Sequence, residues 1–403
     1  MKDTFINIVN TVHPQRLSAL AAYFLKDESL GGKLILVAVG LALIAANTPL
    51  APWYDALAHL EITLGIGTWV ISLDLKHWVG DGLMALFFLI VGLELKRELI
   101  QGELRHKETA ILPFAAAIGG MLVPAFIFLA FNIGRDTVGG WAIPTATDIA
   151  LAAGILALIR DKVPSSVRIF LLALAIVDDI LAVIIIAVFY STGLNVFLVV
   201  AMLALAAFVY GLGRFKILPM WGYIVGGAIM WIMALNSGIH PSITGVILGI
   251  IAPIASSKHP EDHIAERVER VLIPFSALLV VPLFAFVNTG ISLDISHIGP
   301  EAAAPLVAGI IAGLVVGKPV GIFVASWLMV KAGYARLPNQ ASWRHIIGIG
   351  GLSGVGFTIA IFVTDLSYGN AEYVTMAKLA IVAASTIAAM LGLVLLRSVK
   401  NPA

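Results

Sequence analysis

Long apolar stretches recur along almost the whole chain, and this pattern constrains the fold more than any other feature of the sequence. A helix needs about 20 mostly apolar residues to cross the hydrocarbon core of a bilayer, which is about 30 Å thick. Twelve such stretches are present, near residues 33–48, 78–100, 109–132, 139–159, 166–190, 194–212, 217–235, 239–255, 268–290, 303–330, 343–365 and 373–397. We therefore expect an all-α polytopic membrane protein with about twelve transmembrane helices, organised as a single domain over residues 1–403.

Composition supports this class and excludes several others. Only 12% of the 403 residues are charged, whereas about a quarter of the residues of a soluble domain are charged. An ordinary water-soluble enzyme and a disordered chain are therefore excluded. The formal net charge of +1 excludes a protein that binds nucleic acid mainly by charge. Because the chain has no cysteine, disulfides and thiolate metal sites are also excluded.

The distribution of basic residues predicts the orientation of the chain, because lysine and arginine concentrate in cytoplasmic loops. We take residues 1–30 as a cytoplasmic N-terminal segment and alternate sides across twelve spans. This places 21 of the 25 basic residues on the cytoplasmic side, leaving Lys76 and Arg135 outside and Lys318 and Lys378 within spans. Both termini are therefore predicted to be cytoplasmic.

One external segment has a different pattern. Residues 48–77 are predicted to be an external loop, and within it residues 60–74 partly alternate apolar and polar side chains around a Gly-Ile-Gly-Thr turn. Such alternation favours a small β-hairpin, with an irregular loop as the alternative.

Two neighbouring aspartates lie in the middle of a predicted span. Asp178 and Asp179 have no basic residue near them in the sequence, and an ionisable group at the centre of a bilayer costs about 3 kcal/mol or more, so it suggests a functional site. Two such carboxylates repel each other. The pair is therefore suited to hold protons in one state and to offer hard oxygen ligands to a small cation in another. A purely structural pair would need two cations or complete hydrogen bonding.

Three further irregularities extend this pattern. Asp148 follows Ile143-Pro-Thr-Ala-Thr147, and Lys318 precedes Pro319 in a span. Proline interrupts a helix, while threonine side chains satisfy the backbone groups that it frees. Five glycines crowd residues 348–356, which indicates either an unwound segment or close helix packing. A buried lysine such as Lys318 also requires a carboxylate partner.

The two helices predicted to be interrupted are spans 4 (139–159) and 11 (343–365). They occupy matching positions, because each is the second in a group of three spans (3–5 and 10–12). Discontinuous helices in matching positions of two halves are typical of transporters built from inverted repeats, with the substrate site at the breaks. Because an odd-numbered span opens one triple and an even-numbered span opens the other, the second copy is inverted in the membrane. The sequence therefore predicts inverted repeats and discontinuous helices 4 and 11.

For the remaining charged residues within spans, a structural explanation stands as an alternative to a functional one. Glu94 lies among other charged residues at a helix end and suits a solvated, paired terminus. Asp81 is either an entry group or an interfacial residue. Lys378 lies about one turn inside the last span, so we expect it to extend its ammonium group to the membrane surface.

Several motifs of the sequence resemble those of the NhaA-type bacterial sodium–proton antiporters, over residues 20–397. These motifs are Phe87-Phe-Leu-Ile-Val-Gly-Leu-Glu-Leu-Lys-Arg-Glu98, Trp141-Ala-Ile-Pro-Thr-Ala-Thr-Asp148, Ala173-Leu-Ala-Ile-Val-Asp-Asp179, Ser237-Gly-Ile-His240, Ile310-Ile-Ala-Gly-Leu-Val-Val-Gly-Lys-Pro319 and Gly356-Phe-Thr358. The resemblance implies an electrogenic antiporter that exports Na⁺ or Li⁺ in exchange for more protons and is active at alkaline pH. It implies no cofactor, a bacterial inner-membrane location and a homodimer formed through the external hairpin.

The resemblance also assigns roles to individual residues. Asp178 and Asp179 match the pair that binds Na⁺ and carries protons, Lys318 matches the lysine that pairs with the first aspartate, and Asp148 and Thr147 match the broken helix beside the site. Further residues match the funnels and the pH response of the family, namely Asp81, Glu94, His240, Glu269 and Thr358. One departure concerns Arg270 and Ile273, because well-known relatives carry histidines there.

Two other functions are compatible with aspartates in a membrane. An intramembrane aspartyl protease needs two aspartates on facing helices, in Tyr-Asp and Gly-x-Gly-Asp contexts. Here the paired acids are neighbours in the sequence, Asp148 follows Thr147, and Asp81 follows Val79-Gly80. A cation channel does not need a lysine in the middle of the membrane, and its pore is usually formed by repeated subunits. Saturable counter-transport rather than ohmic current distinguishes an antiporter from a channel.

Overall fold

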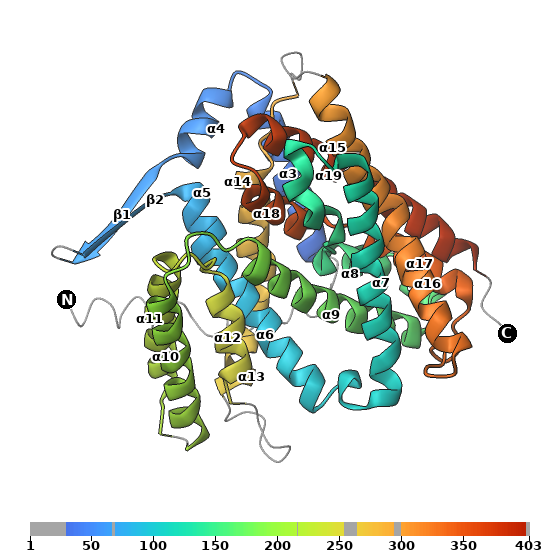
Figure 1. The fold of residues 1–403 in the computed structure, drawn as a ribbon, viewed down its shortest axis with the longest axis horizontal. Coiled ribbons are helices and arrows are strands. Elements are labelled where there is room, and N and C mark those ends of the chain that lie inside the picture. Colours follow the sequence, from blue (N-terminus) through green and yellow to red (C-terminus); the bar gives the residue numbers. More distant parts are fainter. Residues whose placement is uncertain (1–29, 67–68, 216, 254–263, 294–299, 400–403) are drawn as a thin grey trace.

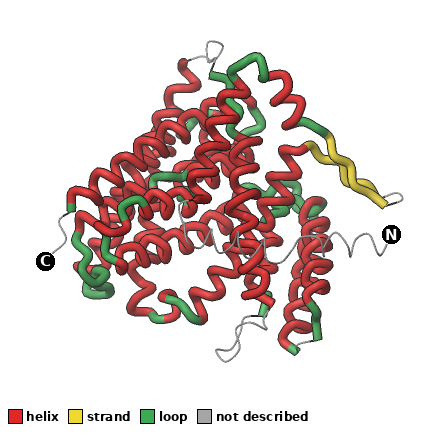
Figure 2. Tube along the Cα trace, turned by 180° about the vertical axis from the view of Figure 1, so that it is seen from behind, coloured by secondary structure: helices red, strands yellow, loops and turns green. Residues whose placement is uncertain are grey.

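The described part of the chain is a bundle of helices with one small β-hairpin at its edge. The computed structural model describes residues 30–66, 69–215, 217–253, 264–293 and 300–399. The predicted cytoplasmic segment 1–30 therefore lies almost entirely outside the described residues. Figures 1 and 2 show the helices packed side by side and the hairpin projecting away from them.

The first group of elements carries the hairpin. It consists of α3 (Leu30–Ala46), α4 (Ala51–Ala58), β1 (Glu61–Ile66), β2 (Trp69–Asp74), α5 (Leu75–His77), η1 (Trp78–Leu83) and α6 (Met84–Ile100). The strands are antiparallel, with Glu61 opposite Asp74, which confirms the hairpin predicted within residues 60–74. The indole of Trp78 donates a hydrogen bond of 2.9 Å to the carbonyl of Ile62 and ties the hairpin to η1. We call the end of the bundle that carries the hairpin the hairpin end, and the other end the opposite end.

The second group contains the first broken helix. It consists of η2 (Glu103–Arg105), α7 (Lys107–Asn132), η3 (Asp136–Thr145), α8 (Ile149–Ala157), η4 (Arg160–Lys162) and α9 (Ser165–Phe189). The helices η3 and α8 are bent by 40° at the break between them. Pro144 lies in the last turn of η3, and the backbone of Ala146 and Asp148 is extended. The helix is therefore interrupted where the proline and threonines predict it.

A third group lies to one side of the bundle. It consists of α10 (Val196–Arg214), α11 (Met220–Leu235), α12 (Ile243–Ile251), α13 (Ile264–Phe275), η6 (Ser276–Val280) and α14 (Val281–Asn288). In Figure 1, α10 and α11 run side by side at the edge of the molecule, next to α12. A cavity of about 760 Å³ between α6, α11 and α12 is lined almost entirely by apolar side chains.

The last group contains the second broken helix. It consists of α15 (Pro300–Ala312), η7 (Gly313–Gly317), α16 (Lys318–Lys331), α17 (Trp343–Ser353), α18 (Phe357–Ser367) and α19 (Ala371–Ser398). The helices α17 and α18 are bent by 47° at Gly354-Val-Gly356. The glycine-rich stretch also packs closely, because a Cβ atom added to Gly351 would lie 2.9 Å from the Cα atom of Gly392. The stretch is therefore interrupted at Gly354-Val-Gly356 and closely packed at Gly351, so both of the predicted structures occur in it.

The number of spans is only partly settled. Among the described residues, seven helices are long and apolar enough to cross a membrane, or up to ten if each bent pair counts as one span. The helix α11 is apolar but shorter, and the predicted span 239–255 contains α12, which has nine residues. A multi-pass helical membrane protein is thus supported, while the exact count of twelve stays a prediction.

The core is centred on the two breaks. One large cluster of buried apolar side chains includes Ile143 and Ala146 from the first break and Val355 and Phe357 from the second. Beside it, α7 and α16 cross in contact, because a Cβ atom added to Gly119 would lie 2.3 Å from the carbonyl oxygen of Gly321. Close crossings of this kind fix the positions of helices that lack a strong hydrophobic driving force between them.

Candidate ion-binding site

The two broken helices meet at their breaks. The backbone N–H of Asp148 donates to the carbonyl of Val355 at 2.6 Å, and the hydroxyl of Thr147 donates to the carbonyl of Ser353 at 2.9 Å. Near the hairpin end, the hydroxyl of Tyr368, just after α18, donates to the carbonyl of Thr137 at the start of η3. The two broken helices therefore cross in opposite directions.

Asp148 stands between two helix N-termini. Its Oδ1 atom accepts a hydrogen bond from the N–H of Leu151 in the first turn of α8 at 3.0 Å. Its Oδ2 atom accepts from the backbone N–H and the hydroxyl of Thr358 in the first turn of α18, at 3.0 and 2.7 Å. Helix N-termini carry partial positive charge and free N–H groups. The buried carboxylate therefore satisfies and balances both half-helices at once.

Lys318 and Asp178 form a buried ion pair beside this crossing. The Nζ atom of Lys318 lies 2.6 Å from Oδ2 of Asp178 and donates to the hydroxyl of Thr147 at 2.8 Å. The lysine side chain is 0% exposed and that of Asp178 is 2% exposed. Lys318 begins α16 directly after the π-helical turn η7, and such wider turns often mark functional positions in a helix. The structure thus supplies the carboxylate partner that the sequence requires.

Asp179 is buried beside the pair but is held differently. Only 3% of the residue is exposed, and no hydrogen bond or ion pair from another described residue is seen at its carboxylate. Its charged neighbours are Asp178, Glu94, Asp148 and Lys318. A buried carboxylate without a fixed partner is costly unless a proton or a cation neutralises it. The arrangement is therefore suited to an exchangeable occupant.

The outlying predicted residues lie at the two ends of the bundle. Toward the hairpin end, the Oδ1 atom of Asp81 lies 3.1 Å from Nε2 of His240. Toward the opposite end, Arg97 forms a 2.8 Å ion pair with Glu269, and both are charged neighbours of Glu94. Glu94 follows Asp81 by thirteen positions along η1 and α6, which is about 20 Å at the usual helical rise. These residues therefore flank the crossing on both sides, and Thr358 alone of this set lies within it.

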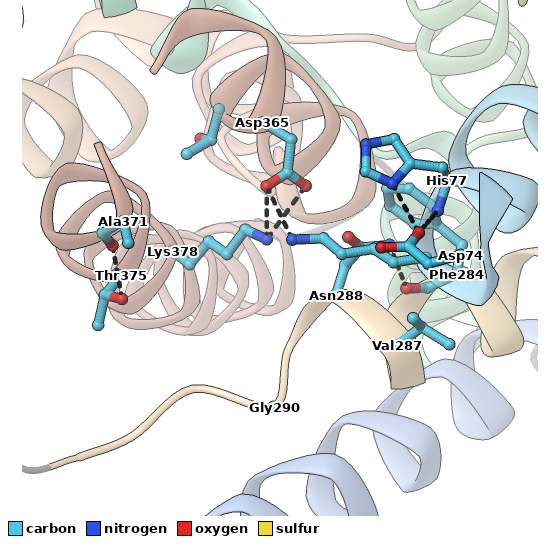
Figure 3. A network of polar contacts seen from close by, with 12 residues as sticks. Asp74, His77, Phe284, Val287, Asn288, Gly290, Asp365, Ala371, Thr375 and Lys378 are labelled. Atoms are coloured by element: carbon cyan, nitrogen blue, oxygen red, sulfur yellow. Dashed lines mark hydrogen bonds and ion pairs between the residues drawn. The ribbon is translucent and has the colours of Figure 1, made fainter. Parts of the chain in front are cut away.

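One acid was overlooked by the sequence interpretation, and one lysine was misread. Asp365 lies in α18 inside the predicted span 343–365, and Lys378 donates to its carboxylate at 3.0 Å (Figure 3). Lys378 is only 3% exposed, so the prediction that it extends to the membrane surface is wrong. A count of every acid within the predicted spans would have included Asp365 and suggested a partner for the lysine.

The part of the chain that the structure describes contains no cluster typical of a resident metal site. Among the described residues, no group of three or more His, Cys, Asp or Glu side chains is arranged to hold a metal ion. The apolar cavity between α6, α11 and α12 is lined by none of the buried aspartates or by Lys318. The buried aspartates and Lys318 therefore lie at the crossing and not in the lining of this cavity.

Comparison with known proteins agrees with the resemblance seen in the motifs. Residues 22–396 match the family model described as Na⁺/H⁺ antiporter 1. The chain is 44% identical to the Na⁺/H⁺ antiporter NhaA of Vibrio campbellii over 377 residues, which cover 93% of this chain and 94% of that protein. It is 43% identical to the antiporter of the same name from Aliivibrio salmonicida over 384 residues, covering 94% and 98% of the two chains.

A solved structure supports the fold. The sodium proton antiporter MjNhaP1 from Methanocaldococcus jannaschii, determined at pH 8, matches with a TM-score of 0.51 and 15% identity, covering 95% of this chain and 98% of that chain. The relatives of 43–44% identity are named as Na⁺/H⁺ antiporters, which are transporters, and this confirms the prediction of a transporter rather than an enzyme. Since the family model spans nearly the whole sequence and relatives exceed 40% identity along it, the chain belongs to the Na⁺/H⁺ antiporter 1 family.

Proposed function

We propose that this chain is an electrogenic Na⁺/H⁺ antiporter of the bacterial inner membrane. It exports Na⁺, and also Li⁺, in exchange for a larger number of protons, and it is active at alkaline pH. The observation that carries the proposal is the Lys318–Asp178 ion pair, 2.6 Å long and buried beside Asp179 at the crossing of two broken helices. Na⁺, Li⁺ and H⁺ are the substrates, and no cofactor takes part.

The proposed mechanism is competition at one shared site. Na⁺ binds to the carboxylates of Asp178 and Asp179 when both are ionised, because a hard cation prefers oxygen ligands. Binding requires Lys318 to leave Asp178, since an ammonium group and Na⁺ compete for the same oxygens. Protons that arrive from the other side of the membrane bind at Asp179 and at the Asp178–Lys318 pair, which restores the ion pair and releases Na⁺. The hydroxyl of Thr147, which accepts from Lys318 at 2.8 Å, remains as a partner for the displaced lysine.

Alternating access would come from the two discontinuous helices. Their opposite directions at the crossing support inverted repeats formed by spans 3–5 and 10–12. In such transporters one group of helices rocks against the rest around a fixed midplane site. The charge distribution of the sequence supports an orientation with both termini in the cytoplasm and the hairpin end outside. Glu94, a charged neighbour of Asp179, would then lie on the cytoplasmic approach, with Glu269 beyond it, and Asp81 and His240 on the external one.

The wild-type protein tests this proposal. In everted membrane vesicles that have been acidified by respiration, added Na⁺ or Li⁺ should release protons, as measured by acridine orange fluorescence, whereas K⁺ should not. Because protons compete with Na⁺ at the carboxylates, the apparent KM for Na⁺ should rise by up to about tenfold for each unit by which pH is lowered, for one competing proton. Activity should therefore grow from pH 6.5 to pH 9. An apparent KM that does not change with pH would contradict the shared site.

We further propose that the protein forms a homodimer through the hairpin. Among the described residues the ribbon β1–β2 has two strands, so each has one edge that is not paired with another strand, and such edges pair readily with another chain. Leu64 and Val70 are 56% and 58% exposed on it. Replacing residues 61–74 by a short Gly-Ser linker should convert a cross-linked dimer to monomer on a denaturing gel, while vesicles retain Na⁺/H⁺ exchange. A linker variant that cross-links as efficiently as wild type would contradict the proposal.

A further inference from the structure

Three charged residues form a cluster at the hairpin end that the proposed transport cycle has not used. The carboxylate of Asp365 in α18 accepts from the ammonium group of Lys378 in α19, at 2.8 Å to Oδ1 and 3.0 Å to Oδ2. The ammonium group of Lys76 in α5 lies 3.7 Å from the same Oδ1 atom. Figure 3 shows the carboxylate of Asp365 directed at Lys378, with the Asp74–His77 pair close by.

The two bridges of this cluster differ in what they connect. Lys378 and Asp365 belong to consecutive helices, and the lysine side chain is 4% exposed, so this bridge holds α18 and α19 together. Lys76 is 33% exposed and belongs to the segment that runs through η1 into α6. The longer and more exposed Lys76–Asp365 bridge therefore joins two separate parts of the bundle, and exposed bridges shift an equilibrium by less than about tenfold.

The same half-helix connects this bridge to the ion site. Thr358, at the start of α18, hydrogen-bonds to Asp148, and Asp365 follows seven residues later, which is about 10 Å along a helix. Between them, the ring of Phe362 packs against His240, with a centroid distance of 4.9 Å. It also packs against Phe88 and Phe284, at 5.7 and 6.1 Å. Aromatic rings from α6, α14 and α18 and the ring of His240 therefore pack together on the same half-helix, between Thr358 at the crossing and Asp365 in the bridge.

We propose that the Lys76–Asp365 bridge is a latch that keeps the hairpin end closed, with Lys378 holding Asp365 in position. The latch rests on the alternating access proposed above, because the site can open to the hairpin end only if α18 separates from α5 and η1. In that step Lys76 and Asp365 part, while the buried Lys378–Asp365 bridge stays intact. The latch thus sets the share of molecules that are open to the hairpin end.

The Lys76→Met variant tests the latch because it removes one arm and leaves the buried bridge in place. The apparent affinity for an ion scales with the fraction of molecules whose site is open to its side. The KM for Na⁺ at the hairpin face should therefore fall about threefold. At the opposite face KM should stay the same or rise slightly, since most molecules already open there. Right-side-out and everted vesicles report the two faces separately.

Two further variants act as controls. Lys76→Arg keeps the charge and should retain the wild-type KM at both faces. His77→Gln removes a neighbouring pair that is local, because the backbone N–H and the ring of His77 both bind Asp74 three residues away, and it should leave both KM values unchanged. A KM at the hairpin face that is unchanged or higher in Lys76→Met, or that falls equally at both faces, would overturn the latch.

A second measurement separates the latch from the proposed function. Hydrogen–deuterium exchange without any substrate should be about threefold faster in Lys76→Met for the last turn of α18 and for residues 75–83, but not in His77→Gln. If wild-type vesicles show no Na⁺/H⁺ exchange, the proposed function fails and this measurement decides the latch alone. Equal exchange rates in wild type and Lys76→Met would then overturn it.

Discussion

The Asp179→Asn variant should lose Na⁺/H⁺ and Li⁺/H⁺ exchange by at least about 100-fold while remaining folded. Asparagine has nearly the same volume, so the buried position stays filled, but it neither ionises nor binds a hard cation as strongly as a carboxylate. Asp179 is 3% exposed and has no fixed partner among the described residues, so its loss leaves no other charged group unpaired. Purified protein in proteoliposomes measures exchange as Na⁺-dependent proton flux, and size-exclusion chromatography checks the fold.

The matched control is Asp55→Asn. Its side chain is 77% exposed and pairs with His59, the residue that follows α4, so exchange should equal that of wild type. Asp178→Asn should also abolish exchange, but it leaves the ammonium group of Lys318 buried without its partner, and breaking a buried pair costs about 3–5 kcal/mol. The two aspartate variants should therefore differ in thermal stability. Full exchange in Asp179→Asn would remove Asp179 from the site.

Much of the route to this site could be predicted from local sequence. Pro144 with its two neighbouring threonines indicates where the first helix breaks, because proline removes a backbone donor and clashes with the preceding turn. The glycines of residues 348–356 indicate the second break less clearly, since glycine serves both unwinding and close packing. The hairpin was also predictable, because strand alternation is a local pattern.

Contacts between distant segments could not be predicted in the same way. The cost of burying a charge requires a partner for Lys318, but Asp178 is 140 residues away in the sequence, and only the packing of α9 against the crossing selects it. Apart from the family resemblance, nothing in the sequence indicates that Asp148 binds both half-helices. Such choices depend on tertiary structure.

The misreading of Lys378 has the same physical origin. A lysine one or two turns inside a span often extends to the membrane surface, and this is the default when no acid is known nearby. Here the carboxylate of Asp365, from a different helix, lies 2.8 Å from the ammonium group of Lys378 and keeps it buried. The length of α12 is a second example: the apolar residues of 239–255 are sufficient for a span, but among the described residues 239–253 the helix covers nine, Ile243–Ile251.

In the proposed mechanism the charge carried per cycle depends on Lys318, and the Lys318→Arg variant tests this dependence. If Lys318 stayed protonated throughout, replacing one proton on Asp179 by one Na⁺ would move no net charge. The proposed electrogenic exchange therefore needs a second exchangeable proton, and we place it on the Asp178–Lys318 pair beside Asp179. Arginine preserves the positive charge and the bridge to Asp178, but its guanidinium group does not lose a proton in proteins.

In Lys318→Arg proteoliposomes, exchange should fall about tenfold, a loss of about 1.4 kcal/mol, because the planar guanidinium group does not fit the site of a compact ammonium group. The remaining exchange should be electroneutral. The current on a solid-supported membrane, divided by the Na⁺ flux, gives the charge moved per Na⁺. A membrane potential set with valinomycin should no longer change the exchange rate of the variant. Wild-type protein in the same vesicles should respond to the clamped potential. A variant that still moves the wild-type charge per Na⁺ would show that the second proton resides elsewhere, with Glu94 as the next group to test because it is a charged neighbour of Asp179.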